Sequence, residues 1–553
     1  MSTQRSGGQR TYADAIEALN TLQSNAATIE AIRKSGGRLN DFAIPEMVEY
    51  LGRIGYTQED LNRLNVIHIT GTKGKGSTSA FTSSLLQHAS PGAKIGLYTS
   101  PHMIAVRERI RINGSPLDEA DFADKFWHVW DALEQNTARA HEFTPLRPIY
   151  FRFLTLLAFH TFLAHKVDTA ILEVGIGGMY DSTNIVPRPV VCGITALGMD
   201  HVAMLGNTIE LIAAQKAGIY KHGSAALAVR QLLGRESAEK VLEDRAKEVG
   251  ASSFHFVRTP AGEDPISSVK LGLPGIHQYS NASLALALAQ TFVRSPVGKQ
   301  VFAGAEESLG PLILEGGDEA AAVQQITPLA KQALEAAHWP GRCQRIPSQT
   351  SAITYFLDGA HTTDSLALCA RWFLSSSSSS AAEQGKKRRR VFIFNCTNGR
   401  SGPDLLGSVL SEIEAGSSTS TSDSSSSSSP SSRFATAARF FTDVAFCTNT
   451  TFRSGRSAGD LTSKAVDPAD LEALTIQNQL KDAWLSLVGS GDDEAAKVHV
   501  LPSIEDALLL VKEGNGAEET QVLVSGSLHL VGGVMAHLRE EGLLDDELRS
   551  VYA

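Results

Sequence analysis

The sequence predicts an α/β protein whose sheets are mostly parallel. Short apolar runs at residues 169–174 and 391–394 have the length and composition of strands that are buried on both faces. Longer stretches of helical character separate such runs, which is typical of repeated βα units. Comparable runs occur at residues 65–70, 190–195, 354–357 and 521–524. Because ligands of such sheets bind at the carboxyl ends of the strands, we expect the functional residues there.

Composition excludes several classes of protein. The 553 residues, 42% of them hydrophobic and 20% charged, are typical of a globular protein of several domains. The net charge of −10 disfavours sequence-independent binding to nucleic acids, because their phosphates would be repelled. The longest apolar run, 153–164, is too short to span a bilayer and predicts a buried helix. Five scattered cysteines without a CxxC pair indicate a reducing compartment.

Three segments are expected to lie outside the folded core. Residues 1–15 are predicted to form a disordered tail. The first part of this tail has no apolar stretch and is therefore no secretory signal, whereas Arg5 and Arg10 without an acid leave a mitochondrial presequence as the alternative. The serine-rich segments 375–390 and 416–432 are predicted to be flexible insertions. The basic cluster 386–390 is expected to be a solvated loop, with a nuclear signal or an anion patch as alternatives.

The strongest site signal is the segment Gly71-Thr-Lys-Gly-Lys-Gly-Ser77, between an apolar run and a helical segment at 78–88. Glycines allow backbone N–H groups to surround phosphate oxygens, and a helix N-terminus adds a positive dipole end. Lys75 is expected to reach the outer phosphates of a nucleotide. The match to GxxxxGK[ST] is imperfect because Gly76 separates Lys75 from Ser77, so a plain glycine turn is the alternative.

A second signal is the segment Glu173-Val-Gly-Ile-Gly-Gly178 at the end of another apolar run. A carboxylate at a strand end beside a phosphate loop is a suitable oxygen ligand for the Mg²⁺ of a nucleotide. The alternative is that Glu173 is structural. Asp181 and Asn184, which follow, either cap the next segment or contact substrate.

Further candidates are ambiguous on their own. Asp200-His201 precedes a helix of small apolar residues that carries Lys216, where a buried ammonium would need an acid or a modification. Arg342 offers a guanidinium to phosphate, and the segment from Asp358 to His361 follows an apolar run. The segment from His277 to Asn281 opens a helix and offers amides to a ligand. Each of these residues also has a plain structural explanation.

Taken in order, these segments resemble the folylpolyglutamate synthases of the Mur ligase-like family of ATP-dependent amide ligases. The resemblance extends from about Asn65 to Gly533 and is interrupted by the serine-rich segments. It includes the blocks Tyr98-Thr-Ser-Pro-His102 and Arg107-Glu-Arg-Ile-Arg-Ile-Asn-Gly114, which separate folate ligases from peptidoglycan ligases. Further matching blocks begin at Tyr150 and at Ser525.

The resemblance implies a fold and a set of functional residues. An N-terminal P-loop mononucleotide-binding domain (1–335) with a parallel-rich sheet would precede a smaller, Rossmann-like α/β domain (336–553). Lys216 would be carried as a carbamate that assists a second metal, and a monovalent cation is a further expected cofactor. The implied residues are Lys75, His201 and Lys216 for catalysis; Gly71, Thr72, Lys73, Gly74, Lys75, Gly76, Ser77, Asn281, Arg342, Asp358 and His361 for ATP; Ser100, Glu173 and His201 for Mg²⁺; and Ser100, Pro101 and His102 for the folate side.

The implied activity is the ATP-dependent addition of L-glutamate to the γ-carboxylate of (tetrahydro)folyl-(poly)glutamate through an acyl phosphate, which retains folates for one-carbon metabolism. A dihydrofolate synthase or a bifunctional folate ligase is the first alternative. A nucleotide-binding protein without ligase activity is the second. The expected partners are folate, L-glutamate and ATP, without nucleic acid or membrane insertion. We expect a monomer in the cytoplasm, with a mitochondrial form in the matrix or at the inner membrane.

The chain departs from the family pattern at three places. Met179 stands where bacterial relatives often carry arginine, and Lys73 replaces the more usual asparagine. Residues 395–400 differ from the usual Asn-x-Thr-Gly-Asp-Arg, which puts contacts in the second domain in doubt. None of these departures removes an expected metal ligand.

Overall fold

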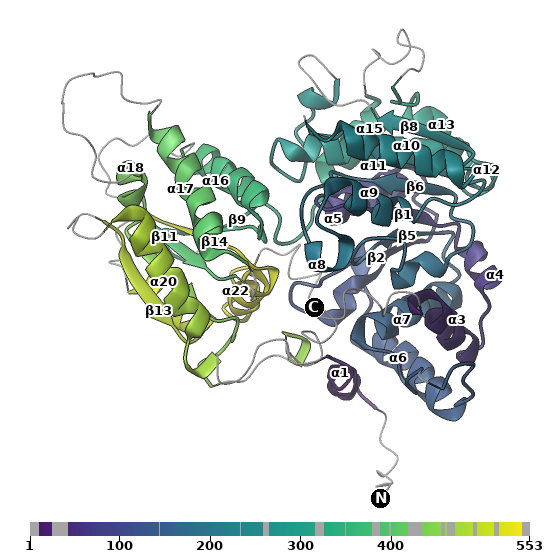
Figure 1. Ribbon diagram of the computed structural model, residues 1–553, viewed down its shortest axis with the longest axis horizontal. Coiled ribbons are helices and arrows are strands. Elements are labelled where there is room, and N and C mark those ends of the chain that lie inside the picture. Colours follow the sequence, from purple (N-terminus) through teal and green to yellow (C-terminus); the bar gives the residue numbers. More distant parts are fainter. Residues whose placement is uncertain are drawn as a thin grey trace, which may run out of the picture. The chain divides into compact units, whose positions relative to one another are not determined.

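The computed structural model describes residues 10–24, 42–142, 144–232, 234–257, 265–315, 326–348, 350–378, 388–396, 400–418, 434–454, 459–461, 471–489, 495–513 and 519–544. The chain folds as two compact units, each built on its own sheet (Figure 1). Unit 1 comprises residues 1–102 and 106–339, and unit 2 comprises residues 103–105 and 340–553. The boundary predicted between residues 335 and 336 falls at the end of helix α15 (Pro328–Ala336).

Unit 1 is organised around an eight-stranded sheet in the order β4-β3-β2-β5-β1-β6-β7-β8. The strands from β2 to β8 in this order pair in parallel, and β3 is antiparallel to β2 and β4. Strand β1 therefore lies between β5 and β6, at the centre of the parallel part. The bounds are β1 (Ile67–Thr70), β2 (Ile95–Tyr98), β3 (Ile110–Ile112), β4 (Ser115–Pro116), β5 (Thr169–Glu173), β6 (Val191–Ile194), β7 (Ala225–Val229) and β8 (Ser253–Val257).

Helices cover both faces of this sheet (Figure 1). Helices α5 (Lys75–Ala89), α11 (His277–Arg294) and α15 form one apolar cluster with Ile67 and Ile69 of β1. Helices α6 (Glu119–Gln135) and α7 (Tyr150–His165) pack with Tyr98 and Leu172 in another cluster, so the helix predicted around 153–164 is confirmed. The remaining helices are α1 (Tyr12–Asn20), α3 (Ala43–Arg53), α4 (Gln58–Leu61), α8 (Val202–Leu205), α9 (Ile209–Ala217), α10 (Glu236–Glu248), α12 (Pro296–Val301) and α13 (Ala305–Leu309).

Unit 2 contains a six-stranded sheet in the order β13-β12-β11-β14-β10-β9, parallel except for β9. Helices from its middle part and from its C-terminal part contribute to two separate apolar clusters. The predicted fold class, α/β with two parallel-rich sheets, is confirmed. The bounds are β9 (Gln344–Pro347), β10 (Ile353–Leu357), β11 (Arg388–Phe394), β12 (Asp443–Cys447), β13 (Lys497–Leu501), β14 (Glu519–Ser525), α16 (Thr363–Ser378), α17 (Gly402–Ser418), α18 (Ala435–Ala438), α20 (Thr475–Val488), α21 (Ile504–Lys512) and α22 (Leu528–Glu540).

The predicted disordered tail is too long at its C-terminal end. Helix α1 begins at Tyr12, and Thr11 and Asp14 cap it reciprocally through their side chains and backbone amides. Ile16 and Leu19 are buried on its inner face. Residues 1–9 lie outside the described part of the chain. The sequence contains both the capping residues and the apolar residues of α1, but the helix has only nine residues and its pattern is therefore weak.

The predicted insertions are also wrong at their edges. Helix α16 continues through the serine run to Ser378, and α17 continues to Ser418. Strand β11 begins at Arg388 because this residue pairs with Glu519 of β14 in the sheet register. Residues 379–387 and 419–433 lie outside the described residues.

The arginines of the basic cluster belong to the sheet rather than to a solvated loop. Arg388 forms an ion pair with Glu519 at 3.1 Å, and Arg389 forms one with Asp443 at 3.1 Å. Asp443 is 7% exposed and also accepts hydrogen bonds from His499 and Thr442. These charges are therefore compensated within unit 2.

Within the described residues, no helix is both long and apolar enough to cross a membrane. All five cysteines are buried free thiols.

We predict that Asp443→Asn destabilises unit 2 at neutral pH by about 2 kcal/mol, because charged hydrogen bonds are lost. Burial pushes the pKa of the Asp443 carboxyl upward, but hydrogen bonds from His499, Arg389 and Thr442 and the Arg389 charge leave that pKa below its usual value. The carboxylate therefore stabilises the fold above the pKa of an unfolded aspartate, about 3.9, and this contribution is lost as pH falls through the folded pKa. Hydrogen exchange of the β11 and β12 amides should show a difference from wild type at pH 7 that narrows as the pH falls below the unfolded value of about 3.9. A difference independent of pH would contradict this account.

Candidate active site

The glycine loop follows β1 and leads directly into α5, which begins at Lys75 rather than at Thr78. Two of its glycines are required by close packing. A Cβ on Gly71 would lie 1.7 Å from Thr195 Oγ1, and a Cβ on Gly74 would lie 2.1 Å from Asn281 Oδ1. Gly74 also adopts a left-handed φ of +88°, which favours glycine. The structure thus brings Asn281, predicted from a distant segment, against the loop.

Residues after β6 hold the loop from the neighbouring strand. The amides of Thr72 and Lys73 both donate to the carbonyl of Ala196, at 2.9 and 3.1 Å. The hydroxyl of Thr195 donates to the Lys73 carbonyl at 2.6 Å. Thr195 and Ala196 were not predicted as site residues, because only the pairing of β1 with β6 brings them to the loop.

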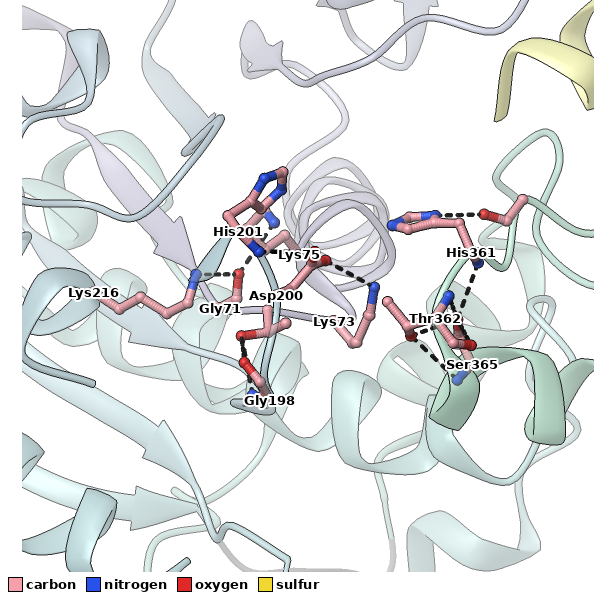
Figure 2. A network of polar contacts seen from close by, with 12 residues as sticks. Gly71, Lys73, Lys75, Gly198, Asp200, His201, Lys216, His361, Thr362 and Ser365 are labelled. Atoms are coloured by element: carbon pink, nitrogen blue, oxygen red, sulfur yellow. Dashed lines mark hydrogen bonds and ion pairs between the residues drawn. The ribbon is translucent and has the colours of Figure 1, made fainter. Parts of the chain in front are cut away.

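Two lysines donate to the same carbonyl oxygen, that of Gly71 (Figure 2). The distance from this oxygen is 3.1 Å to Lys75 Nζ and 2.9 Å to Lys216 Nζ. Lys216 is only 3% exposed, so its predicted burial is confirmed. Burial, reinforced by the charge of Lys75, lowers the pKa of Lys216 well below its usual value, although Asp200 opposes this. The neutral amine of Lys216 is therefore favoured far more than in water.

Lys73 connects the loop to the segment of His201. Its ammonium pairs with Asp200 Oδ2 at 3.2 Å, and Asp200 Oδ1 accepts the backbone N–H of His201 at 2.9 Å (Figure 2). His201 has a left-handed φ of +52° at the start of α8. Asp200 had no role in the prediction, although it stands beside His201. The lysine that departs from the family pattern thus has a defined partner.

Glu173 ends β5 and faces the first turn of α5. It is 4% exposed, and its Oε2 accepts the backbone N–H of Ser100 at 3.1 Å. A Cβ on Gly76 would lie 3.6 Å from the same oxygen. Glu173, Ser100 and the loop, with buried Ser77 in the first turn of α5, therefore lie together. In the described part of the chain, no three His, Cys, Asp or Glu side chains form a cluster suited to a metal ion, so Glu173 and His201 are not joined in one.

Asp181 caps the glycine loop that follows Glu173. Its Oδ2 accepts the amides of Gly175 and Ile176, and its Oδ1 accepts the amide and the hydroxyl of Thr183. His68 of β1 lies 2.8 Å from that hydroxyl through Nε2. Burial raises the pKa of Asp181 against the effect of these hydrogen bonds. The sequence left capping and substrate contact open for Asp181, and the structure shows the capping contact.

Asn184 joins the end of the same loop to α9. Its amide nitrogen donates to the carbonyls of Met179 at 2.9 Å and Gly218 at 3.1 Å. The amide of Met179 in turn donates to the Gln215 carbonyl at 2.8 Å. The backbone of Met179 thus serves to fix the helix that carries Lys216, whichever side chain it bears.

The segment predicted for the folate side follows Ser100. Pro101 is exposed, whereas His102 is 6% exposed. The Nδ1 atom of His102 accepts a hydrogen bond from Arg109 Nε at 2.9 Å. Arg109 belongs to a block that was matched in the sequence without a role of its own.

In unit 2, three predicted residues surround Gly359 at the carboxyl end of β10. Asp358 accepts the amides of Cys343 at 2.7 Å and Ala360 at 2.9 Å, and is 8% exposed. The ring of His361 lies 2.8 Å from the Gly359 carbonyl, and its amide donates to Ser365 (Figure 2). A Cβ on Gly359 would lie 2.8 Å from Arg342 Nη1. The departure at 395–400 lies partly outside the described residues, since 397–399 are not described.

Comparison with known proteins places the chain in a family. A folylpolyglutamate synthase of Candida albicans is 42% identical over 541 residues, which is 96% of this chain and 97% of that protein. The chain belongs to the folylpolyglutamate synthase family. A Neurospora crassa folylpolyglutamate synthase is 39% identical over 545 residues, 97% of this chain and 93% of that protein. The predicted enzyme class, an ATP-dependent folate ligase, is therefore confirmed.

The fold agrees with a solved member of the family. A Mycobacterium tuberculosis folylpolyglutamate synthase complexed with ADP aligns with a TM-score of 0.63 at 22% identity. The alignment covers 95% of this chain and 99% of that chain. No family model matches the chain.

We predict that Gly74→Ala weakens ADP binding about tenfold or more. A left-handed backbone costs about 1–2 kcal/mol for a residue with a Cβ, and this Cβ would also displace Asn281. Titration calorimetry with ADP measures the effect. Gly92→Ala is the matched control, because a Cβ there meets nothing within 4 Å. Equal affinities for both variants would show that the loop conformation does not set nucleotide binding.

Proposed function

We propose that unit 1 binds the phosphates of ATP on the loop from Gly71 to Ser77 and uses them to activate the terminal γ-carboxylate of a folyl-(poly)glutamate. The observation that supports this most is that the N-terminus of α5, the ammonium of Lys75 and the buried carboxylate of Glu173 lie together at one loop. The negative charge of phosphate oxygens is complementary to the helix N-terminus and to the ammonium. The carboxylate requires a cation between itself and the phosphates.

The reaction has two steps. A γ-carboxylate oxygen of the folate attacks the γ-phosphorus of ATP, the bond to the β-phosphate oxygen breaks, and ADP leaves. The amine of L-glutamate then attacks the carbonyl carbon of the acyl phosphate, phosphate leaves, and the amine loses a proton. The loop amides and Lys75 bind the phosphoryl oxygens whose charge grows in the first step. Water must be excluded, because it hydrolyses the acyl phosphate.

The residues at the loop suit a magnesium ion in part. Glu173 supplies a hard oxygen ligand beside the first turn of α5, and Ser100 lies next to it through its backbone. Mg²⁺ bound there would neutralise charge on the phosphates. We propose Glu173 and the Ser100 hydroxyl as ligands, and His201 as a third ligand that Asp200 orients. We also propose a monovalent cation as a further cofactor and assign no residue to it.

We also propose that Lys216 reacts with CO2 to form a carbamate. Its neutral amine nitrogen bonds to the carbon of CO2 and releases a proton. This reaction replaces a buried neutral amine with a carbamate anion. Burial and the neighbouring Lys75 favour the neutral amine that this reaction needs. In the described state Lys216 instead donates to the Gly71 carbonyl, so modification would change what holds the loop.

Three residues of unit 2 have a proposed role in nucleotide binding. Arg342, Asp358 and His361 would contact ATP, and L-glutamate would enter as the second substrate.

We propose a monomer that acts in the cytoplasm, with a mitochondrial form directed by its arginine-containing N-terminus. Fractionation of cells that express the chain with and without residues 1–10 tests the localisation.

We predict that Lys75→Ala lowers the rate of glutamate addition to tetrahydrofolate by about 10²–10³-fold, because the charge that stabilises the phosphoryl oxygens is lost. Glu173→Ala should abolish the activity. ADP release that depends on both folate and glutamate is the measurement, and circular dichroism confirms folding. Lys247→Ala on the exposed side of α10 is the control. Near-normal turnover in Lys75→Ala would refute the assignment.

We predict that Lys216→Ala loses activity and regains part of it with short carboxylates such as formate or acetate, which replace the carbamate. Because carbamates are lost on denaturation, native mass spectrometry in bicarbonate buffer checks the modification itself. An active wild-type enzyme whose Lys216 carries no added mass under these conditions would contradict the carbamate.

A further inference from the structure

Arg109 lies at the edge of the site, and the proposed function assigns it neither a ligand nor a role. It ends a 3-10 turn (Val106–Arg109) and immediately precedes β3. Its carbonyl accepts the amide of Thr99 at 3.0 Å, which places its backbone beside the residue that precedes Ser100. Strand β2 in turn pairs with β5, with Tyr98 opposite Leu172. Arg109 and Glu173 thus lie at the same edge of the sheet, where β2 and β5 end, and β2 separates β3 from β5.

Arg109 is largely buried as a residue, but its guanidinium has no counter-anion among the described residues. The residue is 7% exposed, and Nε donates to His102 Nδ1 at 2.9 Å. Because that nitrogen accepts a hydrogen bond, the His102 ring is neutral there and supplies no negative charge. The ring of Tyr150 lies 5.7 Å from the guanidinium carbon. Within the described residues no carboxylate pairs with Arg109, and its two terminal nitrogens have no acceptor.

Neighbouring arginines use more of their N–H groups within the fold or have an ion pair. Arg107 donates to the Leu117 carbonyl, and Arg111 donates to the carbonyls of Glu108 and Gly114. Arg152, from the start of α7, is ion-paired with Glu46. These side chains hold the fold together through partners within unit 1. Arg109 offers the same donors at the site edge and leaves four N–H groups for a ligand.

The terminal nitrogens of Arg109 are not among the fully enclosed polar atoms without a partner, so they stay accessible at the edge of the site and can donate to the anion of a ligand. A guanidinium presents two parallel N–H groups that match a carboxylate in a bidentate pair. We propose that Arg109 binds the α-carboxylate of the terminal glutamate of the folate substrate. The assignment rests on the proposed function, because the γ-carboxylate of the same glutamate must then reach the phosphates beside Glu173. Arg109 would thus select acceptors that end in a glutamate with a free α-carboxylate.

The test compares two acceptors in two enzymes. Wild type and Arg109→Gln are assayed with tetrahydrofolate and with its analogue whose terminal α-carboxyl is a primary amide. We expect Arg109→Gln to raise the KM for tetrahydrofolate about 10- to 100-fold, the effect of losing charged hydrogen bonds. The KM values for ATP and L-glutamate should change little. Wild type should discriminate strongly against the amide, and Arg109→Gln should accept the two acceptors nearly equally.

Controls separate this role from a structural one. Arg111→Gln removes a neighbouring guanidinium that serves backbone carbonyls, and should keep the discrimination between carboxylate and amide even if stability falls. Arg109→Lys retains the charge without the fork and should recover part of the tetrahydrofolate affinity. It also replaces Arg109→Gln if that variant does not fold.

Three outcomes would overturn the inference. Full discrimination against the amide in Arg109→Gln would show that another group reads the α-carboxylate. A rise in the KM for L-glutamate alone would assign the anion to the incoming amino acid. A rise in the KM for ATP alone would assign it to a phosphate. If wild type itself shows no folate-dependent ADP release, the proposed function fails and the role of Arg109 must be sought elsewhere.

Discussion

The carbonyl of Gly71 is the point on which the site of unit 1 depends. It accepts hydrogen bonds from Lys75 of α5 and from Lys216 of α9, two helices that begin far apart in the chain. One neutral oxygen thus holds the two amino groups within a few ångströms of each other and supplies no compensating charge. Burial, reinforced by the charge of Lys75, lowers the pKa of Lys216. In a chain of net charge −10, Lys75 thus provides a local cation at the loop for which phosphate binding is proposed.

Strand β1 supports the loop because its side chains point alternately to the two faces of the sheet. Ile67 and Ile69 pack into the apolar cluster of α5 and α11. His68 and Thr70 point to the other face, where Thr70 donates to the Gly177 carbonyl at 2.6 Å and His68 contacts Thr183. One short strand thus anchors both the helix that follows the glycine loop at Gly71 and the glycine segment that follows Glu173. The geometry of the two loops is coupled through a single element.

Much of the fold and the core of the site could be predicted, because the signals are local. Strand-length apolar runs, the glycine loop and the buried lysine all follow from adjacent residues. The contacts of Thr195, Ala196 and Asp200 could not be predicted, since they arise only when β6 pairs beside β1. The edges of α16 and β11 were wrong for a similar reason: Arg388 is in a strand because β14 pairs with it, although its own sequence is basic and polar. The site residues of unit 2 stay predictions, since only their local contacts are described.

The order of strands in unit 1 has a consequence for how the nucleotide site forms. The loop after β1 is held by residues after β6 and by Lys216, and the latter contact closes a separation of 145 residues. Contacts between such distant segments form late, because the closure entropy must be overcome first. The phosphate loop therefore gains its shape only when most of unit 1 has folded. A nascent chain that has emerged only to the end of α5 contains the whole glycine motif and still lacks a nucleotide site, so ATP binding reports the completion of this unit rather than the presence of its motif.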